Sequence, residues 1–123
     1  MKIILAEDDI HIQYIAKTAL TKLGGHTVAL ANNGFETLAL LENEKPDVIL
    51  LDVMMPQLSG FETCQLLKAN QNTSHIPLIF LSAKTQSQEI EQGFKLGAKG
   101  YILKPFDPMT LHIQIEEILN KLI

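Results

Sequence analysis

Short apolar runs alternate along the whole chain with longer segments in which apolar residues recur at helical spacing. The runs are rich in Ile, Leu and Val and contain little polar alternation, as is typical of strands covered on both faces. This pattern predicts five strands: Lys2–Ala6, Thr27–Ala31, Val48–Asp52, Leu78–Ser82 and Gly100–Lys104. A helical segment follows each of them, so the chain is predicted to form five successive βα units.

The helical segments carry start and stop signals of their own. Asp9 is expected to cap the first helix, which closes at Gly24-Gly25. The last helix is predicted to begin at Asp107-Pro108, an N-cap residue followed by proline, and to continue to Leu122. Five βα units in a row imply one parallel sheet with helices on both faces, joined by right-handed crossovers.

The composition fits one soluble domain over residues 1–123. The chain is 46% hydrophobic and 20% charged, well away from the composition of disordered chains. Its formal net charge is −4, so the chain lacks the excess of basic residues that is typical of proteins binding nucleic acid. We therefore expect no direct contact with nucleic acid.

Cellular location is indicated by cysteine usage and by the apolar runs. Cys64 is the only cysteine, so no internal disulfide can form and a reducing compartment is expected. No apolar run approaches the roughly 18 residues that span a bilayer. The start, MKIILAEDD, turns acidic too soon for a signal peptide. These features predict a cytoplasmic protein that does not insert into a membrane.

Polar side chains stand where the predicted strands end. Ligands of such a sheet bind beyond the carboxyl ends of the strands, at the point where the strand order reverses. Asp52, Ser82 and Lys104 end the third, fourth and fifth strands, and Glu7 and Asp8 follow the first. We therefore expect all five side chains at the same edge of the sheet.

Three carboxylates at one edge would repel one another. Two charges about 5 Å apart at an effective dielectric constant near 20 cost roughly 3 kcal/mol. A divalent cation removes that cost, and an all-oxygen site suits Mg²⁺, with Mn²⁺ as a substitute. No histidine or cysteine stands at zinc-ligand spacing, and the histidines are expected on the surface. With a cation and Lys104 opposite, Asp52 would be placed to attack a phosphoryl group and form an acyl phosphate.

Four short motifs follow this order along the chain: IILAEDD (3–9), LLDVMMPQLSG (50–60), IFLSA (79–83) and GYILKPF (100–106). Each is weak alone, but all four at the ends of strands one, three, four and five are highly specific. Over essentially all 123 residues the chain resembles the receiver domain of bacterial two-component response regulators. The resemblance implies a flavodoxin-like (βα)5 fold of the α/β class, a doubly wound parallel sheet in the order 2-1-3-4-5.

The resemblance also implies a role for each residue at this edge of the sheet. Asp52 corresponds to the phosphoacceptor, and Lys104 to the lysine that pairs first with the acceptor and then with the phosphate. Ser82 resembles the hydroxyl residue that binds a phosphoryl oxygen. Tyr101 resembles the aromatic switch residue that turns inward when Ser82 moves, although it could also be a simple edge aromatic.

Metal binding in the family identifies a second set of residues. Asp8 is expected to bind Mg²⁺ directly and Glu7 through water, while Asp52 and the backbone carbonyl of Met54 complete the protein ligands. The peptide bond before Pro105 is cis in the family, a form that costs little before proline. No organic cofactor is implied.

The implied partners are a histidine kinase or a histidine phosphotransfer protein, and a downstream effector that the sequence does not identify. Phosphorylation is expected to change the surface of helix four, strand five and helix five. Some receivers dimerise through this face when phosphorylated, using acidic residues where this chain has Lys99-Gly100. That difference weakens the case for dimerisation by this face, and a phosphorylation-dependent dimer stays open as a partner.

Other departures from the family pattern are small. Ser59-Gly60 replaces the usual Asp-Gly, and Ser59 remains a suitable N-cap for the third helix. Met54 and Lys84 occupy two positions that tune the lifetime of the phosphate in the family.

Three alternatives compete with a phosphorylation switch that turns over no external substrate. A receiver-like interaction module that no longer uses phosphate would usually lose the acceptor, the lysine or the acidic pair, and this chain keeps all of them. A Mg²⁺-dependent phosphatase typically has a second acid two residues after its nucleophile, where Met54 stands here. An FMN carrier of similar fold would need a Ser/Thr/Gly-rich loop after the first strand, and this chain has no such loop there.

Overall fold

The computed structural model describes residues 1–83 and 87–120 of the protein. Lys84 and Leu122, which the sequence singled out, lie outside this part of the chain. The strands of the described part are β1 (Lys2–Ala6), β2 (Thr27–Ala31), β3 (Val48–Asp52), β4 (Leu78–Ser82) and β5 (Gly100–Leu103). They pair in parallel in the order β2-β1-β3-β4-β5, which confirms the predicted fold class and strand order.

One strand boundary differs from the prediction. β5 ends at Leu103, one residue earlier than expected. The backbone N–H of Lys104 still donates to the carbonyl of Ser82, with 2.9 Å between nitrogen and oxygen. Pro105 has no amide hydrogen with which to continue the ladder, so regular pairing stops there.

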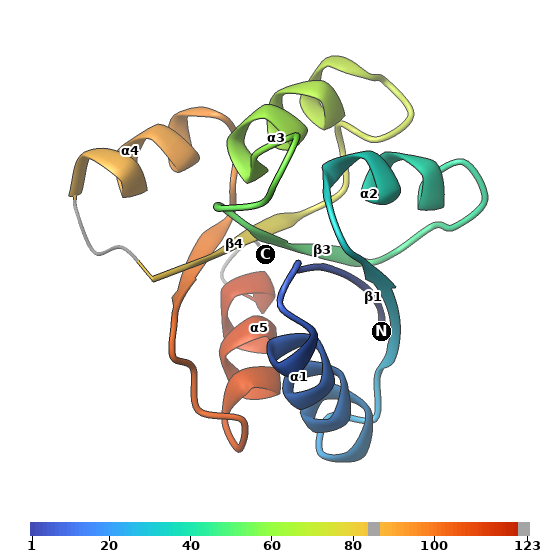
Figure 1. Ribbon diagram of the computed structural model, residues 1–123, viewed down its shortest axis with the longest axis vertical. Coiled ribbons are helices and arrows are strands. Elements are labelled where there is room, and N and C mark those ends of the chain that lie inside the picture. Colours follow the sequence, from blue (N-terminus) through green and yellow to red (C-terminus); the bar gives the residue numbers. More distant parts are fainter. Residues whose placement is uncertain (84–86, 121–123) are drawn as a thin grey trace.

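Helices cover both faces of the sheet (Figure 1). They are α1 (Ile10–Lys22), α2 (Gly34–Leu40), α3 (Gly60–Ala69), α4 (Ser87–Lys95) and α5 (Leu111–Asn120). α1 and α5 lie on one face, and α2, α3 and α4 lie on the other, as a doubly wound topology requires. Within the described residues, every helix is too short or too polar to cross a membrane.

Alternate residues along each strand enter two separate cores. On the side of α2, α3 and α4 the core includes Ile4, Ile49, Leu51, Phe80 and Cys64. On the side of α1 and α5 it includes Ile3, Leu50, Ile79, Leu20 and Ile115. Cys64 is fully buried, as predicted, and burial raises the pKa of its thiol. The apolar runs of the sequence are therefore strands buried on both faces.

The last helix begins later than predicted. Regular α-helix starts at Leu111, and residues 108–110 form a turn before it. The carboxylate of Asp107 accepts from the backbone N–H of Met109 (2.9 Å), and the backbone N–H of Thr110 donates to the carbonyl of Asp107 (3.1 Å). This three-residue closure is tighter than an α-helical turn, so Asp107 starts a turn rather than the helix.

Two histidines depart from the expected surface position. The side chain of His26 is only 9% exposed, and its Nε2 lies 3.1 Å from Oε2 of Glu116. Nδ1 of His112 lies 3.2 Å from the same oxygen. These contacts, that of His26 foremost, lower the pKa of the Glu116 carboxyl. They join the segment before β2 to α5, at the end of the molecule opposite the predicted site.

Candidate functional site

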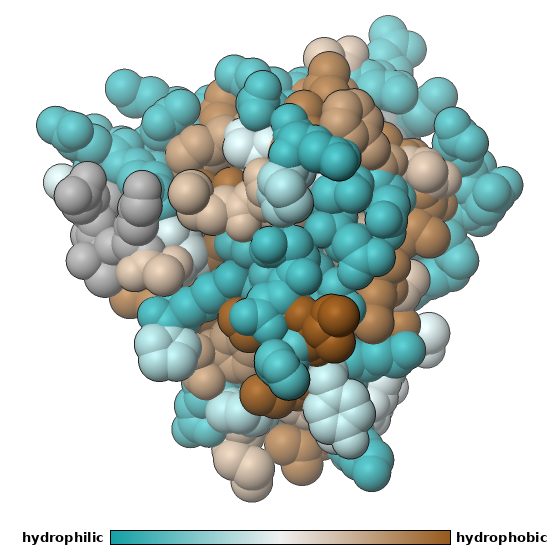
Figure 2. Space-filling view, in the orientation of Figure 1, coloured by the Kyte–Doolittle hydropathy of each residue, from teal (hydrophilic) through white to brown (hydrophobic). Residues whose placement is uncertain are grey.

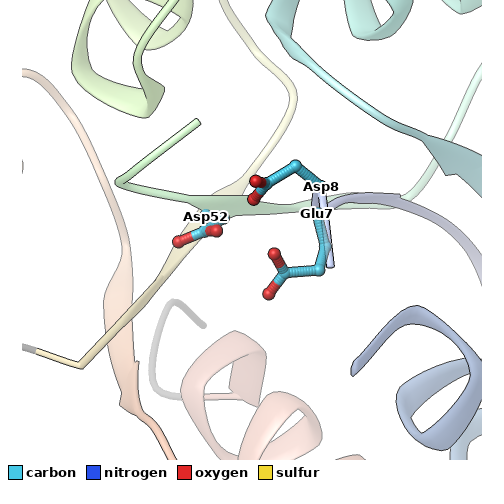
Figure 3. A group of neighbouring side chains, drawn as sticks. All are labelled: Glu7, Asp8 and Asp52. Atoms are coloured by element: carbon cyan, nitrogen blue, oxygen red, sulfur yellow. The ribbon is translucent and has the colours of Figure 1, made fainter. Parts of the chain in front are cut away.

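Three carboxylates meet at the carboxyl ends of β1 and β3. One oxygen from each of Glu7, Asp8 and Asp52 lies within 4.8 Å of the other two. Figure 3 shows that Glu7 and Asp8 leave the chain on different sides and that both carboxylates face Asp52. β1 and β3 are hydrogen-bonded neighbours with Ala6 opposite Leu51, so the residues that come next along the two strands are brought together.

The three acids differ in their exposure to solvent. Glu7 is 1% exposed and Asp52 is 4% exposed, whereas Asp8 is open to solvent. Asp9, directly after them, caps α1 as predicted, because its carboxylate accepts from the backbone N–H groups of His11 and Ile12. Figure 2 shows hydrophilic residues on the viewed surface between α3 and the layer formed by α1 and α5. A cation could therefore reach the buried pair from the side of Asp8.

Lys104 contacts both buried acids. Its ammonium group donates to Oε1 of Glu7 and lies 3.1 Å from Oδ2 of Asp52, while its side chain is 14% exposed. Burial acts to lower the pKa of this ammonium, but the hydrogen bond to Glu7 and the charge of Asp52 outweigh burial and raise it overall. Lys104 is thus a fixed positive charge inside the acidic group.

Among the residues that the structure describes, the positive charge of Lys104 does not balance the acids. Burial raises the pKa of the Glu7 carboxyl, and its contact with Asp52 raises it further. Lys104 and the backbone N–H of Asp9 act in the opposite direction without cancelling the rise. A group of hard oxygen donors that carries uncompensated negative charge fits a divalent cation such as Mg²⁺ or Mn²⁺.

The loop between β3 and α3 wraps closely around Asp52. Oδ1 of Asp52 accepts from the backbone N–H of Met54 at 3.2 Å, which brings the main chain of this exposed residue beside the carboxylate. Gln57 adopts the left-handed conformation with φ of 71°. Ser59 caps α3 as predicted, in a capping box with Glu62. These local features fix where β3 ends and where the carboxylate of Asp52 lies.

Ser82 stands at the end of β4, next to β3 in the sheet. It is 2% exposed, and its hydroxyl donates to Oε1 of Glu89 in the first turn of α4 at 2.8 Å. Nothing in the sequence indicated this contact, because a glutamate in a polar segment reads as a solvated surface residue. In this structure the hydroxyl therefore interacts with α4.

Tyr101 lies on β5, half-buried between aromatic rings. Its ring centroid is 5.4 Å from that of Phe80 and 5.7 Å from that of Phe94. Its hydroxyl donates to the main-chain carbonyl of Glu89 at 2.9 Å. Burial, and then the charge of Glu89, raises the pKa of Tyr101 to about 12. The two residues with a predicted switch role, Ser82 and Tyr101, thus contact the same residue of α4.

Gln13 is a further residue that the sequence did not identify. It is buried on α1, and its side-chain amide donates to the main-chain carbonyl of Glu7 and to the side chain of Asn32. Asn32 in turn donates to Glu36 at the start of α2. This chain of hydrogen bonds fixes the segment that carries Glu7 and Asp8. Spacing alone could not show it, because a single glutamine on a helix carries no signal.

The remaining predicted site feature is the peptide bond that follows Lys104. The Lys104–Pro105 bond is cis, as the resemblance implied.

Comparison with known proteins identifies relatives over nearly the whole chain. A sequence model described as the response regulator receiver domain matches residues 3–116. Protein PilH of Pseudomonas aeruginosa is 39% identical over 116 residues, which cover 94% of this chain and 96% of PilH. The probable transcriptional regulator ycf27 of Cyanophora paradoxa is 38% identical over 120 residues, or 98% of this chain and 48% of ycf27. The chain thus spans about half the length of the ycf27 regulators that it matches.

Solved structures show the same likeness. The chemotaxis protein CheY4 of Vibrio cholerae superposes with a TM-score of 0.88 and 30% identity, covering 95% of this chain and 97% of CheY4. The BeF3-activated receiver domain of DrrB superposes with a TM-score of 0.82 and 29% identity, covering 97% of each chain.

Proposed function

Because the chain belongs to the response regulator receiver domain family, we propose that it is a phosphorylation switch whose phosphoacceptor is Asp52. Receiver domains are signalling modules of two-component systems rather than enzymes that turn over an external substrate. The observation that carries the proposal is the contact of buried Asp52 with Lys104 beside two further acids. Such a site can hold a phosphoryl group between a carboxylate and positive charge.

The cation in this proposal is Mg²⁺, with Mn²⁺ as a substitute. Asp8, Asp52 and the main-chain carbonyl of Met54 would bind it directly, and Glu7 would bind it through water. All of these donors are oxygens, and the exposure of Asp8 leaves room for the water ligands that Mg²⁺ retains. When bound, the cation would supply positive charge to the oxygens of the transferred group.

The phosphoryl donor in this proposal is the phosphohistidine of a histidine kinase or of a phosphotransfer protein. A carboxylate oxygen of Asp52 attacks the phosphorus in line with the leaving nitrogen. The new O–P bond forms as the N–P bond breaks, and the bonding electron pair returns to the imidazole nitrogen, which takes up a proton from water. Lys104 then pairs with a phosphoryl oxygen, which places its charge where negative charge has been added.

Dephosphorylation restores the starting carboxylate. Water attacks the phosphorus of the acyl phosphate, the O–P bond to Asp52 breaks, and inorganic phosphate leaves. The chain thus catalyses its own modification and its reversal, and no metabolite is turned over.

The output of the switch is a change of surface. The hydroxyl of Ser82 moves to a phosphoryl oxygen, Tyr101 turns inward, and the face formed by α4, β5 and α5 changes its packing. Phosphorylation in this scheme shifts an equilibrium between two arrangements of that face. The effector that reads the face is proposed only as a class, a downstream protein or domain.

Acetyl phosphate and Mg²⁺ test the proposal directly. Wild-type protein incubated with both should gain the mass of one phosphoryl group, and Asp52→Asn should gain none. Asp47→Asn is the matched control, since Asp47 is an exposed acid at the opposite end of β3. Equal modification of wild type and Asp52→Asn, or equal modification with and without Mg²⁺, would show that the proposal is wrong.

A further inference from the structure

We propose that Glu89 stabilises the inactive arrangement by accepting hydrogen bonds from both Ser82 and Tyr101. This inference rests on the proposed function, because it assigns a regulatory role to a residue that touches both switch positions. Glu89 is a positioning residue in this proposal: it acts through Ser82 and does not contact the phosphoryl group.

The first contact sets up a competition for one hydrogen atom. The hydroxyl of Ser82 donates to Oε1 of Glu89 at 2.8 Å. A serine hydroxyl has one hydrogen to donate. While Ser82 donates to Glu89, it cannot donate to a phosphoryl oxygen on Asp52. Because the acceptor is a carboxylate and Ser82 is buried, this hydrogen bond belongs to the stronger, charge-assisted class.

The second contact joins the same residue to Tyr101. The phenol hydroxyl donates to the main-chain carbonyl of Glu89 at 2.9 Å. Gly93, one turn further along α4, leaves the space for this hydroxyl, since a Cβ at Gly93 would lie 2.2 Å from it. Phe94, next along the helix, packs against the tyrosine ring. Tyr101 is thus seated against the first two turns of α4.

Together the contacts connect β4, α4 and β5 through Glu89. The side-chain contact holds the first turn of α4 to the end of β4, and the main-chain contact holds Tyr101 to that same turn. When Ser82 turns to the phosphoryl group, the first turn of α4 loses this hydrogen bond to β4, and the acceptor of the tyrosine hydroxyl becomes free to shift. Removing the carboxylate alone should therefore favour the active arrangement.

The affinity for beryllofluoride in the presence of Mg²⁺ measures this effect. In protein labelled with 3-fluorotyrosine, the ¹⁹F NMR signal of Tyr101 can be followed as beryllofluoride is added, which gives the Kd. The Tyr14→Phe variant assigns that signal. Glu89→Ala, which keeps the main-chain carbonyl, should lower the Kd about tenfold, as expected for loss of one competing charge-assisted hydrogen bond. Glu89→Gln retains a weaker, neutral acceptor and should lower the Kd about twofold to threefold. Glu91→Ala removes an exposed carboxylate of the same helix and should leave the Kd unchanged.

A Ser82→Ala background separates this competition from a general effect of charge or of helix stability. In the Ser82→Ala background, which lacks the serine hydroxyl, Glu89→Ala should produce no further change in Kd. The proposal is overturned if Glu89→Ala binds no tighter than wild type, or if it tightens binding equally without Ser82. Should Glu89→Ala fail to fold, Glu89→Gln makes the same comparison, and an unchanged Kd overturns the proposal. Failure of the wild type to bind beryllofluoride overturns the proposed function as well, whereas normal wild-type binding with an unaffected Glu89→Ala overturns this inference alone.

Discussion

The ammonium nitrogen of Lys104 lies 3.1 Å from Oδ2 of Asp52. Lys104 follows β5 and Asp52 ends β3, and β4 lies between these two strands in the sheet. The same nitrogen donates to Glu7, which follows β1. One cation therefore contacts residues from the carboxyl ends of two other strands. Within the described residues, removing Lys104 would leave these two buried carboxylates facing each other without an ion-pair partner.

Lys104→Met should accordingly lower the free energy of unfolding by about 3 kcal/mol, the scale for removing one partner of a buried ion pair. The pKa of Lys104 is raised in the folded protein, so its contribution is fully present below the ordinary value of 10.5 and is lost only as pH rises through the higher folded value. Urea unfolding at pH 7 measures the loss. Lys99→Met, at an exposed position, should change stability by less than about 0.5 kcal/mol. Equal stability of Lys104→Met and wild type would show that the acids do not depend on this lysine.

Glu7→Gln should stabilise the protein at pH 7 when divalent cations are removed. Burial and Asp52 raise the pKa of Glu7, so ionising it costs more in the folded state than in the unfolded state. Below the ordinary value of 4.5 the carboxyl is protonated in both states and this cost disappears. The advantage of Glu7→Gln should therefore shrink as pH falls from 7 to below 4.5, in urea unfolding with EDTA. A variant less stable than wild type at pH 7 would contradict this electrostatic account.

Mg²⁺ should stabilise the folded protein through the acidic group. At a free concentration one hundred times its Kd, one bound ion adds about 2.7 kcal/mol to the free energy of unfolding. Asp8→Asn should remove most of this gain, and Glu117→Gln, an exposed acid on α5, should retain it. Thermal unfolding across a Mg²⁺ titration measures both. A gain that survives Asp8→Asn would place the cation elsewhere.

Gly60→Ala tests how closely the β3–α3 loop packs against Asp52. A Cβ at Gly60 would lie 2.3 Å from the carbonyl oxygen of Asp52 and 2.8 Å from Cα of Val53, so the backbone must move. The free energy of unfolding should fall by about 2–3 kcal/mol. Gly25→Ala is the matched control, because no atom lies within 4 Å of its Cβ and only the left-handed φ of 68° is strained, at about 1 kcal/mol. Equal losses in the two variants would show that the packing at Gly60 is loose.

The fold and the acidic edge of the sheet could be predicted because both depend on local pattern. Apolar runs located four strands to the residue and the fifth to within one. Parallel strands share a carboxyl edge, so an acid at the end of a strand is located by the strand itself. The meeting of Glu7, Asp8 and Asp52 follows from that geometry.

Contacts between helices and the sheet edge could not be predicted in the same way. The bonds of Glu89 to Ser82 and Tyr101 depend on how the first turn of α4 is oriented, which no spacing in the sequence specifies. Short helices also mislead about burial: Phe35 and Phe94 fit an apolar stripe, yet each is about half exposed. Periodicity identifies a helix, but over seven to nine residues it does not fix which ring reaches the core.

The most direct test of the central claim is the chemical location of the phosphoryl group. Protein treated with acetyl phosphate and Mg²⁺ can be reduced with borohydride, which converts an aspartyl phosphate to homoserine, and then mapped by peptide mass spectrometry. Homoserine is expected at position 52 and nowhere else, and none is expected when Mg²⁺ is withheld. Homoserine at position 8 or at another acid, or its absence from the Mg²⁺-treated protein, would contradict the central claim.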